Sequence, residues 1–252
     1  MPHKDAVTQQ FGRNAEAYRM SPVHAQGTDL AVFRETARGL RPHHAVDIGC
    51  GAGHAAFAVA PFCGQIDATD GSAAMLAVVS DEARRRGFSH VHAVQAHAEA
   101  LPYTAASVDL VTCRYSAHHW LDLRTGLHEI RRILRTDATF VVTDSAGSPS
   151  PLVDTHLQAA EVLRDPTHVR SYRVDEWENA LNHCGFAIEN IVRGEVALDF
   201  PSWVARANTP ALRIPVICDL LTTAPREVRT ALAVREDGSF RLDIVTLVAR
   251  AV

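Results

Sequence analysis

The stretch VDIGCGAGHAAF (46–57) places three glycines at alternate positions, Gly49, Gly51 and Gly53, with Asp47 just ahead of them. Glycines in such a turn allow close approach of a ligand and backbone angles that other residues rarely adopt. The free N–H groups at the start of the following helix would face the same ligand. The candidate ligands are a nucleoside triphosphate, a dinucleotide and a sulfonium nucleoside.

The residues around this turn help to distinguish between the three candidate ligands. A P-loop requires GxxxxGK[ST], and the chain contains no Gly-Lys pair. The dinucleotide pattern GxGxxG/A is met loosely by Gly51, Gly53 and Ala56, so an NAD(P)-dependent oxidoreductase stays open. Asp47 argues against a dinucleotide, because a carboxylate there would face a pyrophosphate unfavourably. It suits a ligand with an ammonium group and a sulfonium.

Two adjacent histidines, His118 and His119, provide a second candidate chemistry. Histidine titrates near neutral pH, so either residue could act as a general base, and His118 is the better candidate. Alternatively, one of them packs against Trp120 or caps the next helix. Tyr115 is interpreted as a wall of the cavity. Arg114 is a candidate contact for an acidic group, with a surface or helix-facing position as its alternative.

The segments that carry these residues alternate between strand and helix patterns. Strands are expected at 45–49, 65–70, 90–96, 107–115 and 138–145, and helices at 28–40, 54–62, 72–87 and 122–135. Ser72 and Asp122 are candidate N-caps, and Gly87 is a helix end. Such alternation predicts βαβ units in a parallel sheet. Ligands of these sheets bind outside the carboxyl ends of the strands, where the glycine turn and the histidine pair would lie.

After Ser145 the alternation is less regular. We expect a loop at 147–151, a helix near 174–184 capped at about Asp175, an extended segment at 186–200, and a final strand within 236–251. The whole chain, 1–252, is interpreted as one domain. Its parts are a helical N-terminal cover (1–40), a core (41–145) and a C-terminal part (146–252) with a helical insertion (201–234).

Three motifs together resemble the class I S-adenosylmethionine-dependent methyltransferases. DIGCGAG (47–53) is similar to their first motif. HAEALPYTAASVDLVTCRYSAHHW (97–120) resembles the DAExLPFxDxSFDxV block of the small-molecule branch, typified by ubiquinone and menaquinone biosynthesis enzymes (methyltransferase type 11). FGRNAEAYRMS (11–21) resembles the N-terminal segment that folds over the cofactor in that branch. The resemblance covers residues 11 to about 186.

This resemblance implies an α/β, Rossmann-like, doubly wound sheet of seven strands, mostly parallel, in the order 3-2-1-4-5-7-6 with the last strand antiparallel. It implies S-adenosyl-L-methionine as cofactor, with Asp70 accepting both ribose hydroxyls and Met75 against adenine. Two departures are His97, in place of the family's acid, and RTDA (135–138) in place of a PGG turn. The predicted cofactor-binding residues are Tyr18, Asp47, Gly49, Gly51, Gly53, Asp70, Gly71, Met75, His97, Ala98 and Arg114; His24 is a weaker candidate in the cover.

Composition narrows the function classes. The 252 residues carry a net charge of -4, so no basic excess indicates a nucleic-acid partner. No apolar run approaches the ~18 residues of a membrane span. Five scattered cysteines without CxxC spacing are typical of a reduced, cytoplasmic protein. Neither HExxH nor a Cys/His set at zinc spacing occurs, so we expect no metal.

These observations predict a methyltransferase that acts on a small molecule by in-line displacement (EC 2.1.1.-). The insertion at 201–234, with Trp203, Arg206 and the apolar Leu212, Ile214 and Leu220, is expected to roof the acceptor site. Its apolar character favours an aromatic or apolar acceptor. A homodimer is compatible with the sequence. The alternatives are an NAD(P)-dependent oxidoreductase and a catalytically silent member of the methyltransferase fold that still binds the cofactor.

Overall fold

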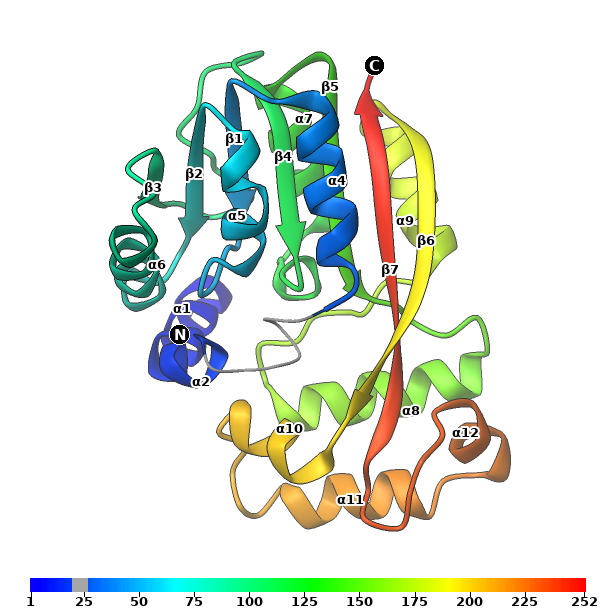
Figure 1. Ribbon diagram of the computed structural model, residues 1–252. Helices are drawn as coiled ribbons and strands as arrows, with labels where there is room; N and C mark the ends of the chain where they lie inside the picture. Colours follow the sequence, from blue (N-terminus) through cyan, green and yellow to red (C-terminus); the bar gives the residue numbers. More distant parts are fainter. Residues whose placement is uncertain (20–26) are drawn as a thin grey trace.

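A single sheet of seven strands organises the chain in the computed structural model, which describes residues 1–19 and 27–252 (Figure 1). The order is β3-β2-β1-β4-β5-β7-β6, as predicted. β1 to β5 pair with one another in parallel, and β7 is antiparallel to both β5 and β6. The strands are β1 (His44–Ile48), β2 (Gln65–Asp70), β3 (Val91–Gln95), β4 (Val108–Arg114), β5 (Leu134–Ser145), β6 (Phe186–Leu198) and β7 (Phe240–Ala251).

Helices flank the sheet on both faces and lie beyond one end of it (Figure 1). They are α1 (His3–Arg13), α2 (Ala15–Arg19), α4 (Leu30–Leu40), α5 (His54–Val59), α6 (Ala73–Arg86), α7 (Leu123–Ile133), α8 (Pro151–Arg164), α9 (Val174–His183), α10 (Phe200–Arg206), α11 (Ile214–Thr222) and α12 (Arg226–Ala231), with the 3-10 turns η1 (Ala60–Phe62) and η2 (Ala117–His119). Within residues 1–19 and 27–252, no helix combines the length and apolar character needed to span a bilayer.

Two buried layers hold the central sheet. On one face, α4, α5 and α6 contribute Phe33, Phe57 and Val79 to one cluster of buried side chains. On the other face, α7 and α9 contribute Leu127 and Trp177 to a second cluster. Because side chains alternate along each strand, β1 supplies both clusters. Because the central strands are buried on both faces, their sequences are short apolar runs and do not alternate between apolar and polar residues.

The helix boundaries follow the capping signals in the sequence. The Ser72 hydroxyl accepts the N–H of Met75 at the start of α6, and Gly87 ends that helix at φ +73°. The Asp122 carboxylate accepts the N–H of Thr125 at 2.7 Å and begins α7. These three predicted caps are confirmed.

The structure differs from the expectation in three places. α8 was not predicted, although the apolar residues that it buries, Val153, Leu157 and Ala160, have helical spacing. β5 begins at Leu134, so residues 135–138 lie inside the strand instead of forming a turn, and Asp137 has φ +64° at this irregular start. Asp175 lies in the first turn of α9 and does not cap it.

The long strands β6 and β7 continue past the central sheet toward a separate group of helices (Figure 1). There α8, α10, α11 and α12 form a third buried cluster with the strand ends, which includes Leu157, Trp203, Ile217, Phe240 and Leu242. This buried cluster lies beyond the carboxyl ends of the parallel strands (Figure 1).

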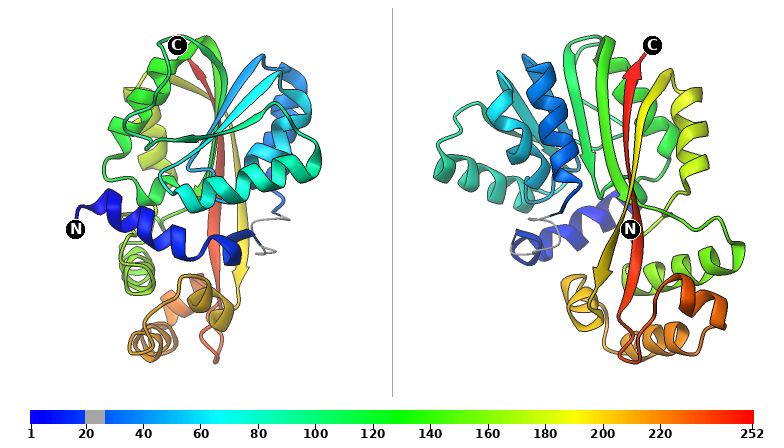
Figure 2. Two further views of the ribbon diagram at one scale, coloured as in Figure 1. Left: turned by 90° about the vertical axis from the view of Figure 1, so that its left-hand side faces the viewer. Right: turned by 45° about the vertical axis from the view of Figure 1, so that its right-hand side comes forward.

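α1 and α2 lie across the carboxyl ends of the parallel strands, between the sheet and these C-terminal helices (Figure 2). His3 Nε2 is 3.0 Å from the carbonyl oxygen of His119, and the Gln10 amide donates to the Ala207 carbonyl at 2.6 Å. α1 therefore contacts both the sheet side and the insertion. His24, the weaker candidate of the cover, lies outside the described residues.

Candidate active site

Two adjoining cavities open where the parallel strands end. The first cavity is bounded by the glycine turn, the ends of β2 and β3, η2 and α1. The second cavity is bounded by η2, α8, α10 and the ends of β6 and β7. Four residues line both cavities: Phe11, Tyr18, Tyr115 and His119. A molecule in one cavity would therefore lie next to a molecule in the other.

The glycine turn leaves room for a ligand in the first cavity. Gly49 and Gly51 have φ of +62° and +51°. A Cβ on Gly49 would overlap the Ser116 hydroxyl, whereas a Cβ on Gly51 would meet no protein atom within 4 Å. Since Gly51 lines the cavity, the space beside it is available to a bound molecule.

Asp70, at the end of β2, is held against this turn. Its Oδ2 accepts the N–H of Gly51 at 3.0 Å, and its Oδ1 accepts the N–H of Ser72 at 2.8 Å. Burial raises the pKa of Asp70, and these two N–H groups oppose the increase. The carboxylate lines the first cavity in one fixed orientation, with lone pairs left to accept further hydrogen bonds.

Asp47 also lines the first cavity, but its carboxylate is only 1% exposed. Its Oδ1 accepts the hydroxyl of Thr112 at 2.7 Å, and its Oδ2 accepts the N–H of Ala56 at 3.1 Å. Burial raises the pKa of Asp47 to about 7, and these two hydrogen bonds oppose the increase. Asp47 therefore fastens the start of α5 to β1 and β4, in addition to facing the ligand space.

Two predicted cofactor residues, Gly53 and Gly71, do not line the first cavity. Gly53 is the residue before α5, at φ +84°, and a Cβ there would lie 2.8 Å from the Phe57 ring. A Cβ on Gly71 would lie 2.6 Å from Cε1 of His97. Their absent side chains allow the turn to pack and His97 to reach the cavity wall.

The other predicted cofactor residues, Tyr18, Met75, His97, Ala98 and Arg114, all line the first cavity. Arg114 forms a buried ion pair with Asp29, and its Nη2 donates to Asp29 Oδ1 at 3.0 Å. Sequence reasoning missed Asp29. The role of His54 also becomes clear: its Nε2 is 3.2 Å from the Tyr18 carbonyl oxygen, which links the glycine turn to the N-terminal cover.

His118 belongs to the second cavity and is paired with Asp144 at the end of β5. His118 Nδ1 lies 2.5 Å from Asp144 Oδ1, and the N–H of His118 donates to Asp144 Oδ2 at 3.1 Å. Burial lowers the pKa of His118, but the charge of Asp144 and its hydrogen bond outweigh this effect and raise it overall. With Nδ1 engaged by a carboxylate, Nε2 is the atom that can accept a proton.

His119 is held in a different state. It is buried, its Nδ1 is 3.0 Å from the Thr167 carbonyl oxygen, and the Phe11 ring meets it edge-on at 4.8 Å. Burial and the neighbouring His118 keep the pKa of His119 well below the ordinary value. Of the two predicted bases, only His118 is paired with a carboxylate that favours its protonated form. His119 is buried and kept neutral, as expected for a residue that lines the cavity. Across the described part of the chain, no group of three or more His, Cys, Asp or Glu side chains could hold a metal ion.

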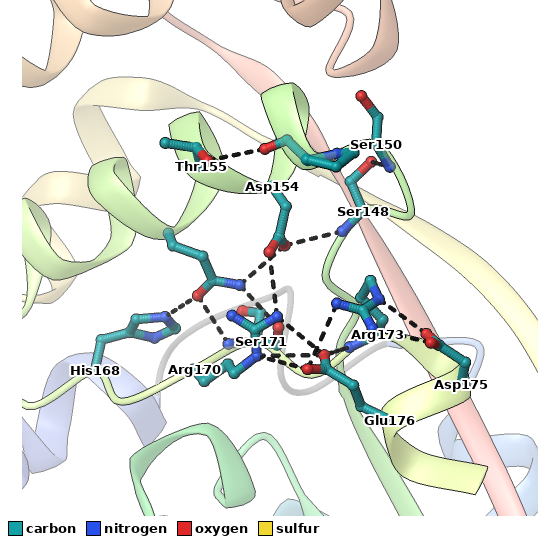
Figure 3. A network of polar contacts seen from close by, with 12 residues as sticks. Ser148, Ser150, Asp154, Thr155, His168, Arg170, Ser171, Arg173, Asp175 and Glu176 are labelled. Carbon is teal, nitrogen blue, oxygen red and sulfur yellow. Dashed lines mark hydrogen bonds and ion pairs between the residues drawn. The ribbon is translucent and has the colours of Figure 1, made fainter. Parts of the chain in front are cut away.

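A polar network fixes the loop between α8 and α9, which contacts the backbone of His118 (Figure 3). Val169 donates its N–H to the His118 carbonyl at 2.8 Å. The next residue, Arg170, bridges Asp154 of α8 at 3.2 Å and Glu176 of α9 at 3.0 Å, as Figure 3 shows. The loop between α8 and α9 is thus fixed on both sides, and it fixes the turn that carries His118.

The walls of the second cavity are mainly apolar, with one charged region. Its apolar residues are Val196, Leu198, Trp203, Leu242 and Ile244, and its charged residues are Glu161, Arg164 and Arg206. Of the insertion residues named above, Trp203 and Arg206 of α10 line this cavity. Leu212 is instead 88% exposed, and Ile214 and Leu220 pack on the C-terminal cluster.

Comparison with known proteins identifies the class. Residues 46–142 match the family described as Methyltransferase domain. The uncharacterised methyltransferase YcgJ of Bacillus subtilis is 35% identical over 224 residues, which cover 89% of this chain and 88% of YcgJ. The chain belongs to the S-adenosylmethionine-dependent methyltransferases, as the motifs predicted, and S-adenosylmethionine is the cofactor of this family.

One further relative and two solved structures are also similar to this chain. The uncharacterised protein YafE of Escherichia coli is 37% identical over 193 residues, which cover 77% of this chain and 93% of YafE. The crystal structure of YcgJ superposes with a TM-score of 0.84 at 32% identity over 88% of this chain and 97% of YcgJ. That of a Bacillus halodurans protein classed with the methyltransferases gives 0.85 at 28% identity over 89% of this chain and 99% of that protein.

Replacing Asp70 by alanine is expected to weaken the binding of S-adenosylhomocysteine by about 1–3 kcal/mol, because ligand hydroxyls would lose a charged acceptor. Isothermal titration measures the affinity. Asp81→Ala, an exposed residue on α6, is the matched control and should bind normally. Unchanged affinity in Asp70→Ala would remove Asp70 from the site.

Proposed function

We propose that the protein methylates a small molecule bound in the second cavity, and that His118 accepts the proton that this acceptor loses. The observation that carries this proposal is the His118–Asp144 pair, which faces a cavity sharing four wall residues with the first cavity. A base with an orienting carboxylate is the arrangement used to activate hydroxyl nucleophiles in unrelated enzymes.

The first cavity fits S-adenosylmethionine. Gly51 leaves space where the backbone meets the ligand, the Asp70 carboxylate can accept ribose hydroxyls, and Met75 provides an apolar surface for a base ring. When bound, the cofactor supplies a methyl group on a sulfonium, a carbon already activated for displacement. The protein has then to orient the acceptor and exclude water. The contacts of α1 with His119 and Ala207 place a cover over both cavities.

His118 can accept the proton of the acceptor molecule while its side chain stays paired with Asp144. As the nucleophilic atom of the acceptor gains the methyl group, its proton passes to Nε2, and the Asp144 carboxylate stabilises the resulting imidazolium. Asp144 is itself held by the N–H groups of His118 and Ser145. An acceptor that carries an ionisable hydroxyl suits this base.

The apolar walls support the expectation of an apolar or aromatic acceptor. Trp203 is 2% exposed and lines the second cavity together with Leu198 and Ile244. Such walls bury a small ligand largely through apolar contact, and a few polar groups orient it. The intact His118–Asp144 pair also argues against the catalytically silent alternative, for which a positioned base has no use.

Transfer of label from methyl-labelled S-adenosylmethionine into a small-molecule extract tests the proposal. We expect labelled small molecules, binding of S-adenosylhomocysteine and no binding of NADH by isothermal titration. Binding of the cofactor without transfer to any extract would favour the silent alternative. Binding of NADH with no affinity for S-adenosylhomocysteine would contradict the proposed function altogether.

A further inference from the structure

The charged region of the second cavity contains an arginine with an unsatisfied hydrogen-bond donor. Arg206, on α10, lines this cavity, and its Nε is buried with no hydrogen-bond partner among the described residues. Within the described part of the chain, no ion pair to Arg206 is found either. Its Nε–H therefore lacks both water and an acceptor, a state that is unfavourable for a buried donor.

The neighbouring arginine is, by contrast, fully engaged. Arg164 pairs with Glu161 at 3.5 Å, donates from Nε to the Trp203 carbonyl at 3.0 Å, and lies over the Trp203 ring at 4.8 Å. Glu161 is thus matched by Arg164, while Asp144 is matched by its hydrogen bond with His118. The buried Nε–H of Arg206, by comparison, has no acceptor among the described residues.

The surroundings of Arg206 favour an anion. Burial and the nearby positive charge of Arg164 lower the pKa of Arg206, and the Tyr18 hydroxyl and Glu161 oppose this effect. A bound anion would replace the missing acceptor and offset the repulsion between the two guanidinium groups. A planar guanidinium fork matches the geometry of a carboxylate, with which it can form two parallel hydrogen bonds.

We propose that the methyl acceptor is an organic acid whose carboxylate pairs with Arg206 in the second cavity. This inference rests on the proposed function and narrows its substrate to a class. The same molecule would place its apolar or aromatic body against Leu198 and Trp203 and present an ionisable hydroxyl to His118. Arg206 then decides which acceptors bind, and His118 decides which of their atoms reacts.

Matched ligand pairs test this assignment. The protein saturated with S-adenosylhomocysteine is titrated with 4-hydroxybenzoate, 4-hydroxyphenylacetate and 4-hydroxycinnamate, and with the carboxamide of each. We expect at least one acid to bind about tenfold or more tightly than its amide. Arg206→Met should remove this preference and leave amide binding unchanged. Arg206→Gln is a second variant, and Arg226→Met, an exposed arginine on α12, is the control.

The outcomes separate this inference from the proposed function. Absence of an acid preference throughout the series, including absence of binding, would overturn the assignment, and so would a preference that survives in Arg206→Met. If an Arg206-dependent preference is found but no acid accepts label, the anion site stands and the proposed function fails. If only uncharged compounds accept label, the proposed function stands and the anion site fails.

Discussion

Replacing His118 by glutamine should lower kcat by about 100- to 10,000-fold while the affinity for S-adenosylhomocysteine stays unchanged. Glutamine keeps a polar side chain but cannot accept a proton at neutral pH. His118 lines the second cavity and not the first, so cofactor binding should not depend on it. His183→Gln, an exposed histidine on α9, is the control. A near-normal kcat would show that His118 is a wall residue only.

The pH dependence supplies an independent readout of the same residue. His118 must be neutral to accept a proton, so kcat should rise with pH through the apparent pKa of His118. Because Asp144 raises this pKa, the rise should be centred above the ordinary histidine value of about 6.5. Asp144→Asn removes the charge that favours the imidazolium, and should move the rise to lower pH and reduce the maximal rate. A pH profile that is the same in both proteins would contradict the pairing.

Replacing Arg114 by methionine should lower the free energy of unfolding by about 3–5 kcal/mol, because it leaves the Asp29 carboxylate buried without its partner. The two side chains are 4% and 2% exposed. Urea denaturation measures the change. The double variant Asp29→Asn/Arg114→Met removes the uncompensated charge and should lose less than the single variant.

A surface pair provides the control for this effect. Arg84 and Asp81 on α6 form an ion pair whose side chains are 77% and 76% exposed. Solvent screening makes such a pair worth at most about 1 kcal/mol, so Arg84→Met should change the free energy of unfolding little. If Arg84→Met and Arg114→Met lowered the free energy of unfolding by similar amounts, burial could not explain the effect of Arg114→Met.

Much of the fold was readable from local patterns. The strands from β1 to β4 and the caps at Ser72, Gly87 and Asp122 depend on neighbours in sequence, and they lie close to where the sequence predicted them. α8 was not predicted, although the apolar residues that it buries have helical spacing in the sequence. The start of β5 was missed because a strand that follows a helix directly gives no turn signal.

The site divides in the same way. The glycine turn, Asp70 and His118 could be found because each is marked by its own residue type beside the end of a predicted strand. The partners Asp144 and Asp29 could not, since Asp144 is 26 residues from His118 and Asp29 is 85 residues from Arg114. The partners of each pair come together only when β4 lies beside β5 and α4 packs against the sheet.

The sequence by itself determined the class of the protein, the cofactor and the edge of the sheet at which they meet, because these depend on short motifs and on strand-helix alternation. The tertiary structure decided which histidine has a carboxylate beside it, which glycines line the first cavity, and which arginine has a buried N–H without an acceptor. Those properties depend on burial and on charges brought together from distant segments, and no local pattern records them.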